Sequence, residues 1–392
     1  MGKKVLIMAG YYVPSIKGGG PIQSIKNLVD NFSTKVDFYI VAADRDLGDD
    51  KPFRNIETNK WVKVGNANVY YTDISKLTWK KTISIFNSVE YDVIYLNSFF
   101  SYKSSTIPIL LRKLKKISSK PIILAPRGQF SPGALGLKNK RKTIYLNVTK
   151  ALRFYKGIIW HATAESEKKD IESVFGSEEK ITVANNLTAN YEELNFDKTL
   201  DKIKGELKLV FISRVHPKKN LKKAIEFLKE IEGIVEFNIF GPLEDKAYWF
   251  QCEKIIKELP TNIKVSYQGL LDHDDIIDVF REHHFFIFPT LGENFGHVIS
   301  EALIGGCPVI ISDQTPWRGL EEEGIGWDIN LSAENKFVEV LQQCVNYNHS
   351  EYKNMSLKSF DYGKLKSNTD NKLNAYENLL SIPLPSNQDV ES

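Results

Sequence analysis

The sequence predicts an α/β protein of two domains, each with a sheet of parallel strands and helices packed against it. At 392 residues the chain is long enough for two domains of ordinary size. Short apolar runs alternate with segments of helical periodicity, which is the pattern of parallel α/β folds. The pattern starts twice, because residues 4–9 and residues 207–212 are each an apolar strand followed by a loop and a helix. Residues 185–205 are polar and lack an apolar period, so we expect the chain to cross between the domains there.

Apolar runs mark the strands of the first half. They occupy residues 4–9, 36–42, 69–72, 91–96, 121–125, 158–163 and 181–183. The loop after the first strand ends in Gly18, Gly19 and Gly20, and Pro21 then stands where a helix begins. No G-x-G-x-x-G is present, so the residues alone leave open whether this loop faces a nucleotide or is a flexible surface loop. Further helices are expected at residues 106–116, 138–156 and 165–174.

The second half repeats the order of strand, loop and helix. Strands are expected at residues 207–212, 235–240, 264–268, 285–288 and 308–311, and helices at residues 221–230, 247–259, 272–283, 297–304, 334–347 and 376–380. The loop after residues 285–288 leads into a helix, and Gly292 and Gly296 let it bend sharply. A loop of this kind at the carboxyl edge of a parallel sheet is suited to an anion, because the helix amides point outward and the helix dipole favours negative charge.

Two carboxylates in this stretch need a reason, because a carboxylate beside a phosphate repels it. Glu293 lies in the loop and Glu301 lies about one turn into the helix, eight residues later. Carboxylates accept hydrogen bonds from the vicinal hydroxyls of a ribose or a sugar ring. Two interpretations stay open: a phosphate on the amides with a sugar hydroxyl pair on each glutamate, or a helix-terminal carboxylate and a solvated loop charge.

Composition excludes several classes of protein. The chain is 42% hydrophobic and 26% charged, as a globular protein is. No window holds 18 consecutive apolar residues, so no spanning helix is expected, and residues 1–14 indicate a first strand and not a signal peptide. The three cysteines, Cys252, Cys307 and Cys344, are widely spaced, which favours a reducing compartment and no metal cluster.

The net charge of +3 hides a strongly basic segment. Residues 101–164 contain fourteen Lys and Arg and no Asp or Glu, so the rest of the chain sums to −11. Residues 138–156 predict a helix with one apolar face in this segment. Three interpretations compete: docking of residues 103–156 on an anionic membrane surface, nucleic-acid binding, and a solvated helix face. No nucleic-acid-binding motif is present, and we favour the membrane.

The segment E-N-F-G-H-V-I-S-E, residues 293–301, resembles the E-x7-E motif of family-4 retaining glycosyltransferases. The preceding F-x-x-P-T and the following E-A-x-x-x-G-x-P-V-I are also similar to that family. The resemblance implies the GT-B fold, in which two Rossmann-like domains face each other across a cleft. It also implies transfer from a nucleotide-sugar with no metal or other cofactor. By the family's pattern Glu293 faces the donor sugar and Glu301 the nucleotide ribose.

Further motifs extend the resemblance to other loops. Residues 214–220 read R-x-x-x-x-K-N, and the family's pattern gives Arg214 and Lys219 the diphosphate and the charge on the leaving nucleotide. The remaining expected donor-binding residues share loop positions next to strands or helices: Gly19, Gly20, Gly241, Leu270, Asn294, Phe295, Gly296 and His297.

The chain also departs from the family. Residues 126–128 read P-R-G, where many members carry a histidine, and this variant resembles a branch that acts on bacterial surface polysaccharides. Arg127 is therefore expected to contact the donor or an acceptor phosphate, or else to be a surface arginine. Trp317 and Arg318 stand where the family often has G-G-x-x-E, so an acceptor role for them is a guess. Asp44 and Asp46 form a D-x-D triplet, which we discount as a metal site because it conflicts with the E-x7-E motif.

The sequence thus predicts an acceptor-side domain at residues 1–186, a donor-binding domain at 187–365, and a helix and tail at 366–392 that return to the first domain. The expected activity is retaining, metal-independent sugar transfer from a UDP- or GDP-linked donor to a glycan acceptor that is lipid-linked. We expect a cytoplasmic location, peripheral on the inner face of the cell membrane, and no nucleic-acid partner. Two alternatives stay open: a sugar-nucleotide 2-epimerase of the same fold, and a non-catalytic module that binds membrane or nucleic acid.

Overall fold

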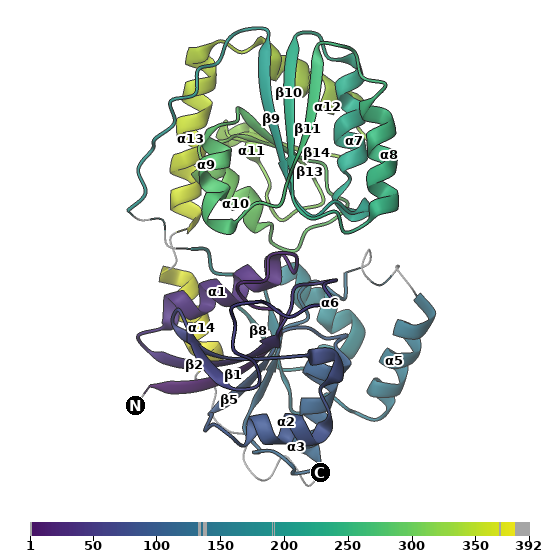
Figure 1. Ribbon diagram of the computed structural model, residues 1–392, viewed down its shortest axis with the longest axis vertical. Coiled ribbons are helices and arrows are strands. Elements are labelled where there is room, and N and C mark those ends of the chain that lie inside the picture. The colour runs from purple at the N-terminus through teal and green to yellow at the C-terminus, as the bar shows by residue number, and fades with distance from the viewer. Residues whose placement is uncertain are drawn as a thin grey trace. The chain divides into compact units, whose positions relative to one another are not determined.

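The computed structural model describes residues 2–131, 135, 139–189, 191, 193–367 and 370–380, and the side chains of 139–141 and 370–372 are outside this description. The tail expected after residue 380 also lies outside the described residues. The chain forms two compact units, shown in Figure 1. Unit 1 consists of Met1–Ala189 with Thr369–Ser392, and unit 2 consists of Asn190–Asn368.

Unit 1 is built on an eight-stranded sheet in the order β3-β4-β2-β1-β5-β6-β7-β8. The strands are β1 (Lys3–Gly10), β2 (Val36–Ala43), β3 (Trp61–Val64), β4 (Ala67–Thr72), β5 (Val93–Leu96), β6 (Ile122–Leu124), β7 (Ile159–Ala162) and β8 (Ile181–Val183). All neighbours are parallel except the edge pair of β3 and β4, which is antiparallel. The sequence analysis did not predict β3, a short strand of half-buried residues.

Helices cover both faces of this sheet. They are α1 (Gly20–Phe32), α2 (Trp79–Phe86), α3 (Ile107–Lys113), α5 (Asn139–Ala151), α6 (Glu165–Phe175) and α14 (Asp370–Leu380), with short turns η1 (Ile74–Lys76) and η2 (Tyr102–Thr106). Alternate residues of β1 point to opposite faces, so Val5 and Ile7 belong to one core and Leu6 and Met8 to another. The first core packs on α1 and α14, and the second on α2, α3, α5 and α6 (Figure 1).

The C-terminal helix α14 belongs to unit 1 although unit 2 separates it from the rest of that unit in sequence. Its side chains Tyr376, Leu379 and Leu380 are buried in the core that contains α1. The ring of Tyr376 also packs against His161, which lies on β7 at the sheet.

Unit 2 has a six-stranded, entirely parallel sheet in the order β11-β10-β9-β12-β13-β14. The strands are β9 (Glu206–Ile212), β10 (Ile234–Phe240), β11 (Ile263–Gly269), β12 (Phe285–Phe288), β13 (Val309–Ser312) and β14 (Gly326–Ile329). Strands β12 and β13 are buried along their whole length, as strands with helices on both faces must be.

The helices of unit 2 are α7 (Leu221–Glu226), α8 (Lys246–Ile256), α9 (Ile276–Arg281), α10 (His297–Ile304), α11 (Leu320–Glu323), α12 (Glu334–Asn346) and α13 (His349–Ser367). Three short turns accompany them: η3 (Pro217–Lys219), η4 (Phe227–Glu230) and η5 (His273–Asp275). Figure 1 shows α7 and α8 on one side of the sheet and α9, α10 and α13 on the other. The expected helix at 221–230 ends early and continues as η4, and the expected helix at 272–283 begins as η5.

No helix in the described ranges is both long and apolar enough to cross a lipid bilayer.

Candidate active site

Most of the predicted donor-site residues of unit 2 lie in loops at the carboxyl edge of its sheet. Because all six strands are parallel, every loop that follows a strand leaves the sheet at this edge. Strand β9 pairs directly with β12, so the loop that carries Lys219 lies beside the loop that carries Glu293. These two residues are 74 positions apart in sequence, and the fold brings their side chains into contact.

Lys219 and Glu293 form a half-buried ion pair. The Nζ of Lys219 donates to Oε2 of Glu293, and the two side chains are only 10% and 21% exposed. The same ammonium lies 5.3 Å from the centroid of the Phe288 ring, which adds a cation–π contact. Burial alone raises the pKa of Glu293, but the charge of Lys219 and its hydrogen bond outweigh burial and lower the pKa below its ordinary value. Glu293 is therefore an ionised carboxylate at neutral pH.

Backbone and side-chain hydrogen bonds join the two loops. Asn220 adopts the left-handed conformation (φ 59°), and its Nδ2 donates to the carbonyl of Pro289 at 2.9 Å. The N–H of Leu291 donates to the carbonyl of Lys218 at 2.8 Å. The sequence analysis treated Asn220 only as a motif letter, whereas in the structure it fixes the separation of Lys219 and Glu293.

The loop after β12 is held in shape up to the start of α10. Gly296 has a φ of +79°, and a Cβ there would lie 2.8 Å from Cδ1 of Ile299 and 3.2 Å from Cγ of Glu293. The indole Nε1 of Trp317 donates to the carbonyl of Phe295 at 2.7 Å. The ring of Phe295 lies against the ring of His297, with centroids 4.7 Å apart. Trp317 therefore supports the loop between β12 and α10.

Glu301 is buried in α10, apart from the Lys219–Glu293 pair. It is 6% exposed, and burial raises the pKa of its carboxyl from 4.5 to about 8. The Nδ1 of His273 lies 3.9 Å from Oε1 of Glu301, which is too long for a hydrogen bond. At neutral pH the Glu301 carboxyl is mostly protonated in this structure.

Arg214 is paired with a residue that the sequence analysis did not select. Its Nη1 donates to Oε2 of Glu244 at 2.5 Å, and both side chains are about one third exposed. Gly241 makes this geometry possible, because a Cβ at its φ of +129° would lie 2.1 Å from the carbonyl oxygen of Ser213. No signal in the sequence distinguishes Glu244, which follows the loop glycine by three residues.

Gly241 and Leu270 lie on neighbouring loops of the same edge. The N–H of Gly241 donates to the carbonyl of Gly269 at 2.7 Å, and the hydroxyl of Tyr267 donates to the carbonyl of Gly241 at 2.7 Å. Leu270 directly follows and is 50% exposed. Leu270 is therefore an exposed residue on this edge of the sheet.

In unit 1, the glycine loop is anchored by one half of the D-x-D triplet. Asp46 accepts hydrogen bonds from the hydroxyl of Ser15 and from the backbone N–H groups of Ile16 and Lys17. Gly19 has a φ of +67°, directly before α1 begins at Gly20. Asp46 thus fixes the approach to Gly19 and Gly20.

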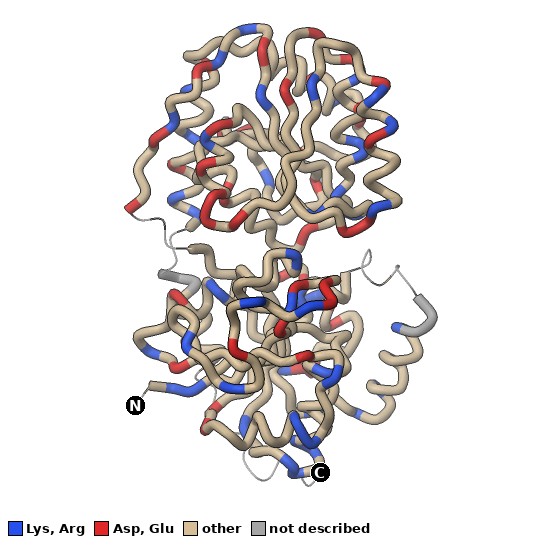
Figure 2. Tube along the Cα trace, in the orientation of Figure 1, with Lys and Arg blue, Asp and Glu red and all other residues tan. Residues whose placement is uncertain are grey.

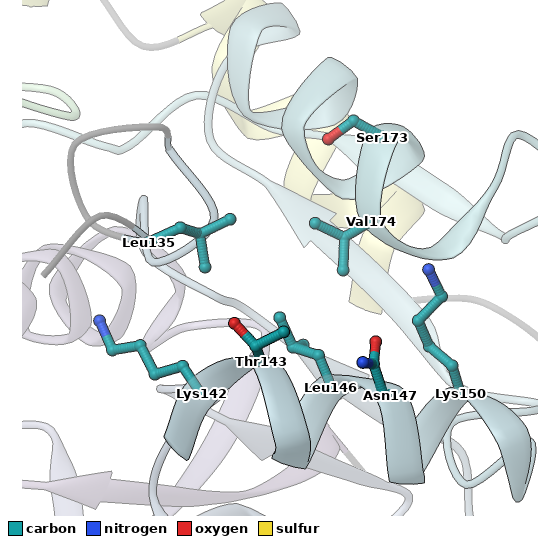
Figure 3. Close-up of a pocket in the computed structure, with 8 residues that line it drawn as sticks. All are labelled: Leu135, Lys142, Thr143, Leu146, Asn147, Lys150, Ser173 and Val174. Atoms are coloured by element: carbon teal, nitrogen blue, oxygen red, sulfur yellow. The ribbon is translucent and has the colours of Figure 1, made fainter. Parts of the chain in front are cut away.

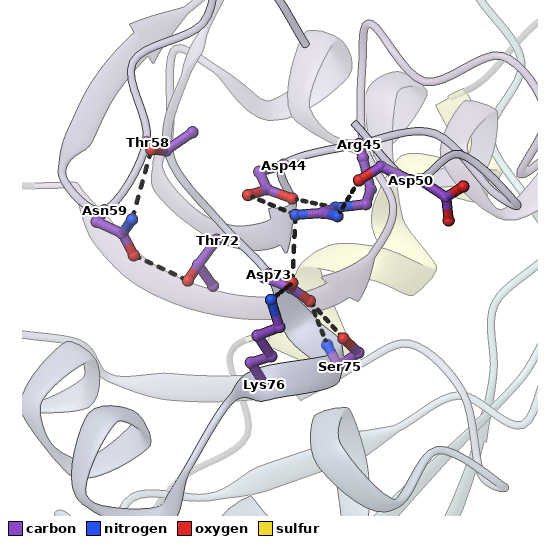
Figure 4. Close-up of polar contacts among 9 residues, drawn as sticks. All are labelled: Asp44, Arg45, Asp50, Thr58, Asn59, Thr72, Asp73, Ser75 and Lys76. Atoms are coloured by element: carbon purple, nitrogen blue, oxygen red, sulfur yellow. Dashed lines mark hydrogen bonds and ion pairs between the residues drawn. The ribbon is translucent and has the colours of Figure 1, made fainter. Parts of the chain in front are cut away.

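The other half of the triplet points into a different network, drawn in Figure 4. Asp44 accepts from Nε of Arg45 at 2.8 Å, and Nη2 of Arg45 lies 3.2 Å from Asp73. Asp44 and Asp46 therefore each have local partners. Among the residues that the structure describes, no group of three or more His, Cys, Asp or Glu side chains is arranged to hold a metal ion.

Arg127 is held inside unit 1. It has a left-handed backbone (φ 57°), and its guanidinium donates to Asn97 at 2.6 Å, Asn186 at 2.6 Å and the hydroxyl of Tyr95 at 3.0 Å. Burial opposes its charge, but Tyr95, Tyr376 and Glu167 raise the pKa above its ordinary value.

The partners of Arg127 are buried and fixed in turn. Burial and the charge of Arg127 lower the pKa of His161 to about 3, so His161 is neutral and hydrogen-bonds to Tyr95. The carboxylate of Glu167 accepts from the N–H of Gly128, next to Arg127, at 2.5 Å. Arg127 is therefore a partly buried residue whose guanidinium is held by hydrogen bonds within unit 1.

The structure thus separates the predicted site residues into three groups. Lys219 and Glu293 are in contact, and Asn294, Phe295, Gly296 and His297 continue the same loop. Arg214, Gly241, Leu270 and Glu301 lie on neighbouring elements of unit 2, and Gly19, Gly20 and Arg127 belong to unit 1. Sequence reasoning missed the supporting residues Glu244, Glu167 and Tyr376.

Comparisons with known proteins agree with this arrangement. Residues 193–356 match the family model described as glycosyl transferases group 1. The chain is 25% identical over 263 residues to an uncharacterized 41.2 kDa protein in the cps region of Klebsiella pneumoniae, covering 64% of this chain and 69% of that protein. It is 23% identical over 256 residues to an uncharacterized glycosyltransferase of Methanocaldococcus jannaschii, covering 60% of this chain and 63% of that protein.

Two solved structures show the same fold. Sucrose-phosphate synthase from Thermosynechococcus elongatus superposes with a TM-score of 0.70 at 14% identity, over 97% of this chain and 98% of that chain. Anabaena HepE in complex with UDP-glucose superposes with a TM-score of 0.66 at 15% identity, over 97% of this chain and 100% of that chain. The prediction of the GT-B fold is confirmed by these superpositions, and residues 193–356 match the group 1 glycosyltransferase model.

Proposed function

We propose that this chain, with its group 1 glycosyltransferase domain, is a retaining enzyme that transfers a sugar from a UDP- or GDP-linked donor to a glycan acceptor without a metal ion. The observation that carries the proposal is the half-buried pair of Lys219 and Glu293 at the carboxyl edge of the unit 2 sheet. A cation and an ionised carboxylate at this edge suit a donor that presents a diphosphate and sugar hydroxyls side by side. The structure of HepE in complex with UDP-glucose, which has the same fold, supports a nucleotide-sugar as the donor.

In the proposed donor complex, the two basic residues neutralise the diphosphate. Lys219 contacts Glu293 and Arg214 contacts Glu244, so the diphosphate would take over part of both contacts. Positive charge in this position stabilises the negative charge that develops on the leaving nucleotide. Glu293 then accepts hydrogen bonds from the donor sugar, and the Glu301 carboxyl binds the ribose hydroxyls.

Catalysis is expected to depend on positioning and charge, with no protein nucleophile. The acceptor hydroxyl attacks the anomeric carbon on the face that the diphosphate leaves, and an oxygen of the leaving diphosphate takes the hydroxyl proton. The bond from the anomeric carbon to the diphosphate breaks as the new glycosidic bond forms, so the anomeric configuration is retained. Hydrogen bonds to three neighbours hold the guanidinium of Arg127 in place. Arg127 would therefore act on a donor or acceptor phosphate through its positive charge.

We propose a lipid-linked glycan as the acceptor, in the biosynthesis of a bacterial surface polysaccharide or O-antigen. The relative in a cps region and the basic segment of residues 103–156 support this proposal. The enzyme would then work in the cytoplasm, peripheral on the inner face of the cell membrane.

The test combines ligand binding with turnover. UDP, GDP and their sugars are screened for an increase in melting temperature with EDTA present, because a ligand that binds the folded state stabilises it. Lys219→Ala and Glu293→Ala should abolish transfer, and circular dichroism should show an intact fold. Near-normal turnover in both variants would contradict the proposal. Epimerised nucleotide-sugar formed without an acceptor would instead identify a 2-epimerase.

A further inference from the structure

Helix α5 exposes an apolar stripe. Ile144, Val148 and Leu152 recur every four residues and therefore lie on one face, and they are 63%, 51% and 71% exposed. The N–H of Leu152 donates to the carbonyl of Val148, which continues the helical pattern past the end of α5. Leu146, on the other side of the helix, packs into the core of unit 1. The helix thus has two apolar faces, and the outer stripe is exposed within the part of unit 1 that the structure describes.

Exposed basic residues lie at the end of this stripe. Lys150, Arg153 and Lys156 are exposed along and just after α5. The side chain of Lys113 lies over the ring of Phe154, with Nζ 5.9 Å from its centroid, so the basic end of α3 lies beside the end of α5. In Figure 2 the described trace between residues 101 and 164 has blue positions and no red ones.

These cations repel one another in the free protein. Burial lowers the pKa of Lys113, and the nearby charges of Arg112 and Lys156 lower it further. Residues 101–164 contain no acidic side chain, and an anionic partner would reduce this repulsion.

A cavity of about 270 Å³ lies between α5 and α6, and Figure 3 shows the side chains that line it. Its apolar wall includes Leu146 and Val174, and two lysines, Lys142 and Lys150, project from α5 at its rim. The ammonium of Lys142 also lies 5.2 Å from the centroid of the Phe100 ring. Apolar walls with cations at the rim suit an amphiphile that carries a phosphate.

We infer that α5 lies in the interface of an anionic phospholipid membrane, with Ile144, Val148 and Leu152 inserted among the acyl chains and the exposed basic residues at its end, Arg153 and Lys156, on lipid phosphates. The inference deepens the proposed membrane contact of residues 103–156 by naming the inserting side chains and the headgroup contacts. Helices with an aliphatic stripe and a basic border bind such interfaces, and their affinity depends on both features.

The composition of the stripe separates a lipid partner from a nucleic acid. Proteins that bind single-stranded nucleic acid stack bases on aromatic rings within a basic groove. The exposed stripe of α5 is aliphatic, and aliphatic side chains gain free energy by leaving water for acyl chains. Binding of RNA or DNA would not need Ile144, Val148 and Leu152, and this difference can be measured.

Sedimentation of the full chain with vesicles tests the inference, without donor or acceptor. We expect binding to vesicles that contain phosphatidylglycerol, little binding to phosphatidylcholine alone, and weaker binding as salt increases. The variant Ile144→Ser/Val148→Ser/Leu152→Ser keeps all charges and should lower the partition coefficient by roughly tenfold or more. Arg153→Gln/Lys156→Gln keeps the stripe and should lower the partition coefficient by roughly 30-fold.

Matched control variants come from unit 2. Phe250→Ser removes an aromatic side chain that is 57% exposed on α8, and Lys257→Gln/Lys264→Gln removes two exposed lysines. Both should leave vesicle binding unchanged. Melting temperatures of all variants check folding, which exposed substitutions should preserve.

A fluorescent reporter tests insertion directly. The three native cysteines are buried, so a cysteine introduced by Val148→Cys can be labelled selectively with an environment-sensitive dye. Its emission should shift to the blue with phosphatidylglycerol vesicles, whereas the same dye on Phe250→Cys should not respond.

Three results would overturn the inference: no vesicle binding, vesicle binding that survives loss of the stripe, or binding to RNA that competes with vesicles and ignores the stripe. Each is independent of turnover, so a failure here leaves the proposed transferase activity intact. Conversely, inactive Lys219→Ala would still bind vesicles if the inference holds.

Discussion

Ionisation of Glu301 should control how tightly the nucleotide binds. Burial raises the pKa of this carboxyl from 4.5 to about 8, so the carboxyl is mostly protonated at neutral pH. If the ionised carboxylate accepts hydrogen bonds from the ribose hydroxyls, nucleotide binding must remove the proton. As the pH is raised towards 8, the Kd should then fall about tenfold per pH unit, and above pH 8 it should level off.

The magnitude follows from the same pKa. With a pKa of about 8, the factor by which protonation weakens binding falls from about 100 at pH 6 to about 2 at pH 8, an improvement of about 50-fold or roughly 2 kcal/mol. Isothermal titration of UDP-glucose across this range measures it. In Glu301→Gln the dependence should vanish, because the amide cannot ionise. A pH-independent Kd in the wild-type protein, or the same slope in the Gln variant, would refute the reasoning.

The same shift makes a prediction for stability with the opposite sign. The folded chain keeps a proton that the unfolded chain loses, so this stabilisation is complete below pH 4.5 and is lost as the pH rises through about 8. The difference of about 3.5 units sets a ceiling of about 5 kcal/mol, and relaxation around the carboxyl lowers the expected effect to about 2 kcal/mol. Glu301→Gln should therefore unfold at higher urea than wild type at pH 8.5 but at equal urea near pH 4.5. Equal midpoints at both pH values would show that the carboxyl is not desolvated.

Three further substitutions test individual contacts. Gly241→Ala should lower the melting temperature and cost roughly 3 kcal/mol, because its Cβ would lie 2.1 Å from a backbone carbonyl oxygen; an unchanged melting temperature would contradict this. Glu244→Gln should release Arg214 and tighten nucleotide binding about twofold to fivefold by calorimetry, whereas weaker binding would mean that Glu244 orients the arginine. Tyr376→Phe should cost about 1 kcal/mol of unfolding free energy through its lost hydrogen bond to Arg127, and no loss would exclude α14 as a support for Arg127.

Much of the fold could be predicted because its signals are local. The strands of unit 2 are continuous apolar runs, and Phe285–Phe288 and Val309–Ser312 are fully buried in the structure. The longest helix, α13, had no such signal. Its buried face includes Ser356, Ser359 and Gly363, and a Cβ at Gly363 would lie 2.8 Å from the backbone N of Ile304 on α10. Small residues that let two helices approach closely look polar in sequence, so periodicity could not find this helix.

The candidate site shows the same division. The sequence motifs predicted Lys219 and Glu293 as site residues. Their ion pair, however, depends on the pairing of β9 with β12, which belongs to the tertiary structure. Glu244 could not be found, because an exposed glutamate 30 positions from Arg214 carries no pattern. The raised pKa of Glu301 results from burial by surrounding elements, so sequence reasoning could place this residue on a helix but could not assign its charge.

Three carboxyl groups near the proposed diphosphate site pose an electrostatic problem, and the structure solves it in three ways. Lys219 neutralises Glu293, Arg214 neutralises Glu244, and at neutral pH a proton neutralises most of Glu301. A dianionic donor therefore approaches these five groups without meeting net negative charge. When the donor binds, it competes with the carboxylates of Glu293 and Glu244 for Lys219 and Arg214. Glu301 is not paired with a cation, so displacing it would give the donor no further positive charge. Donor affinity should accordingly respond more to Glu244→Gln, which removes a competitor outright, than to salt, which screens the donor and the competing carboxylates alike.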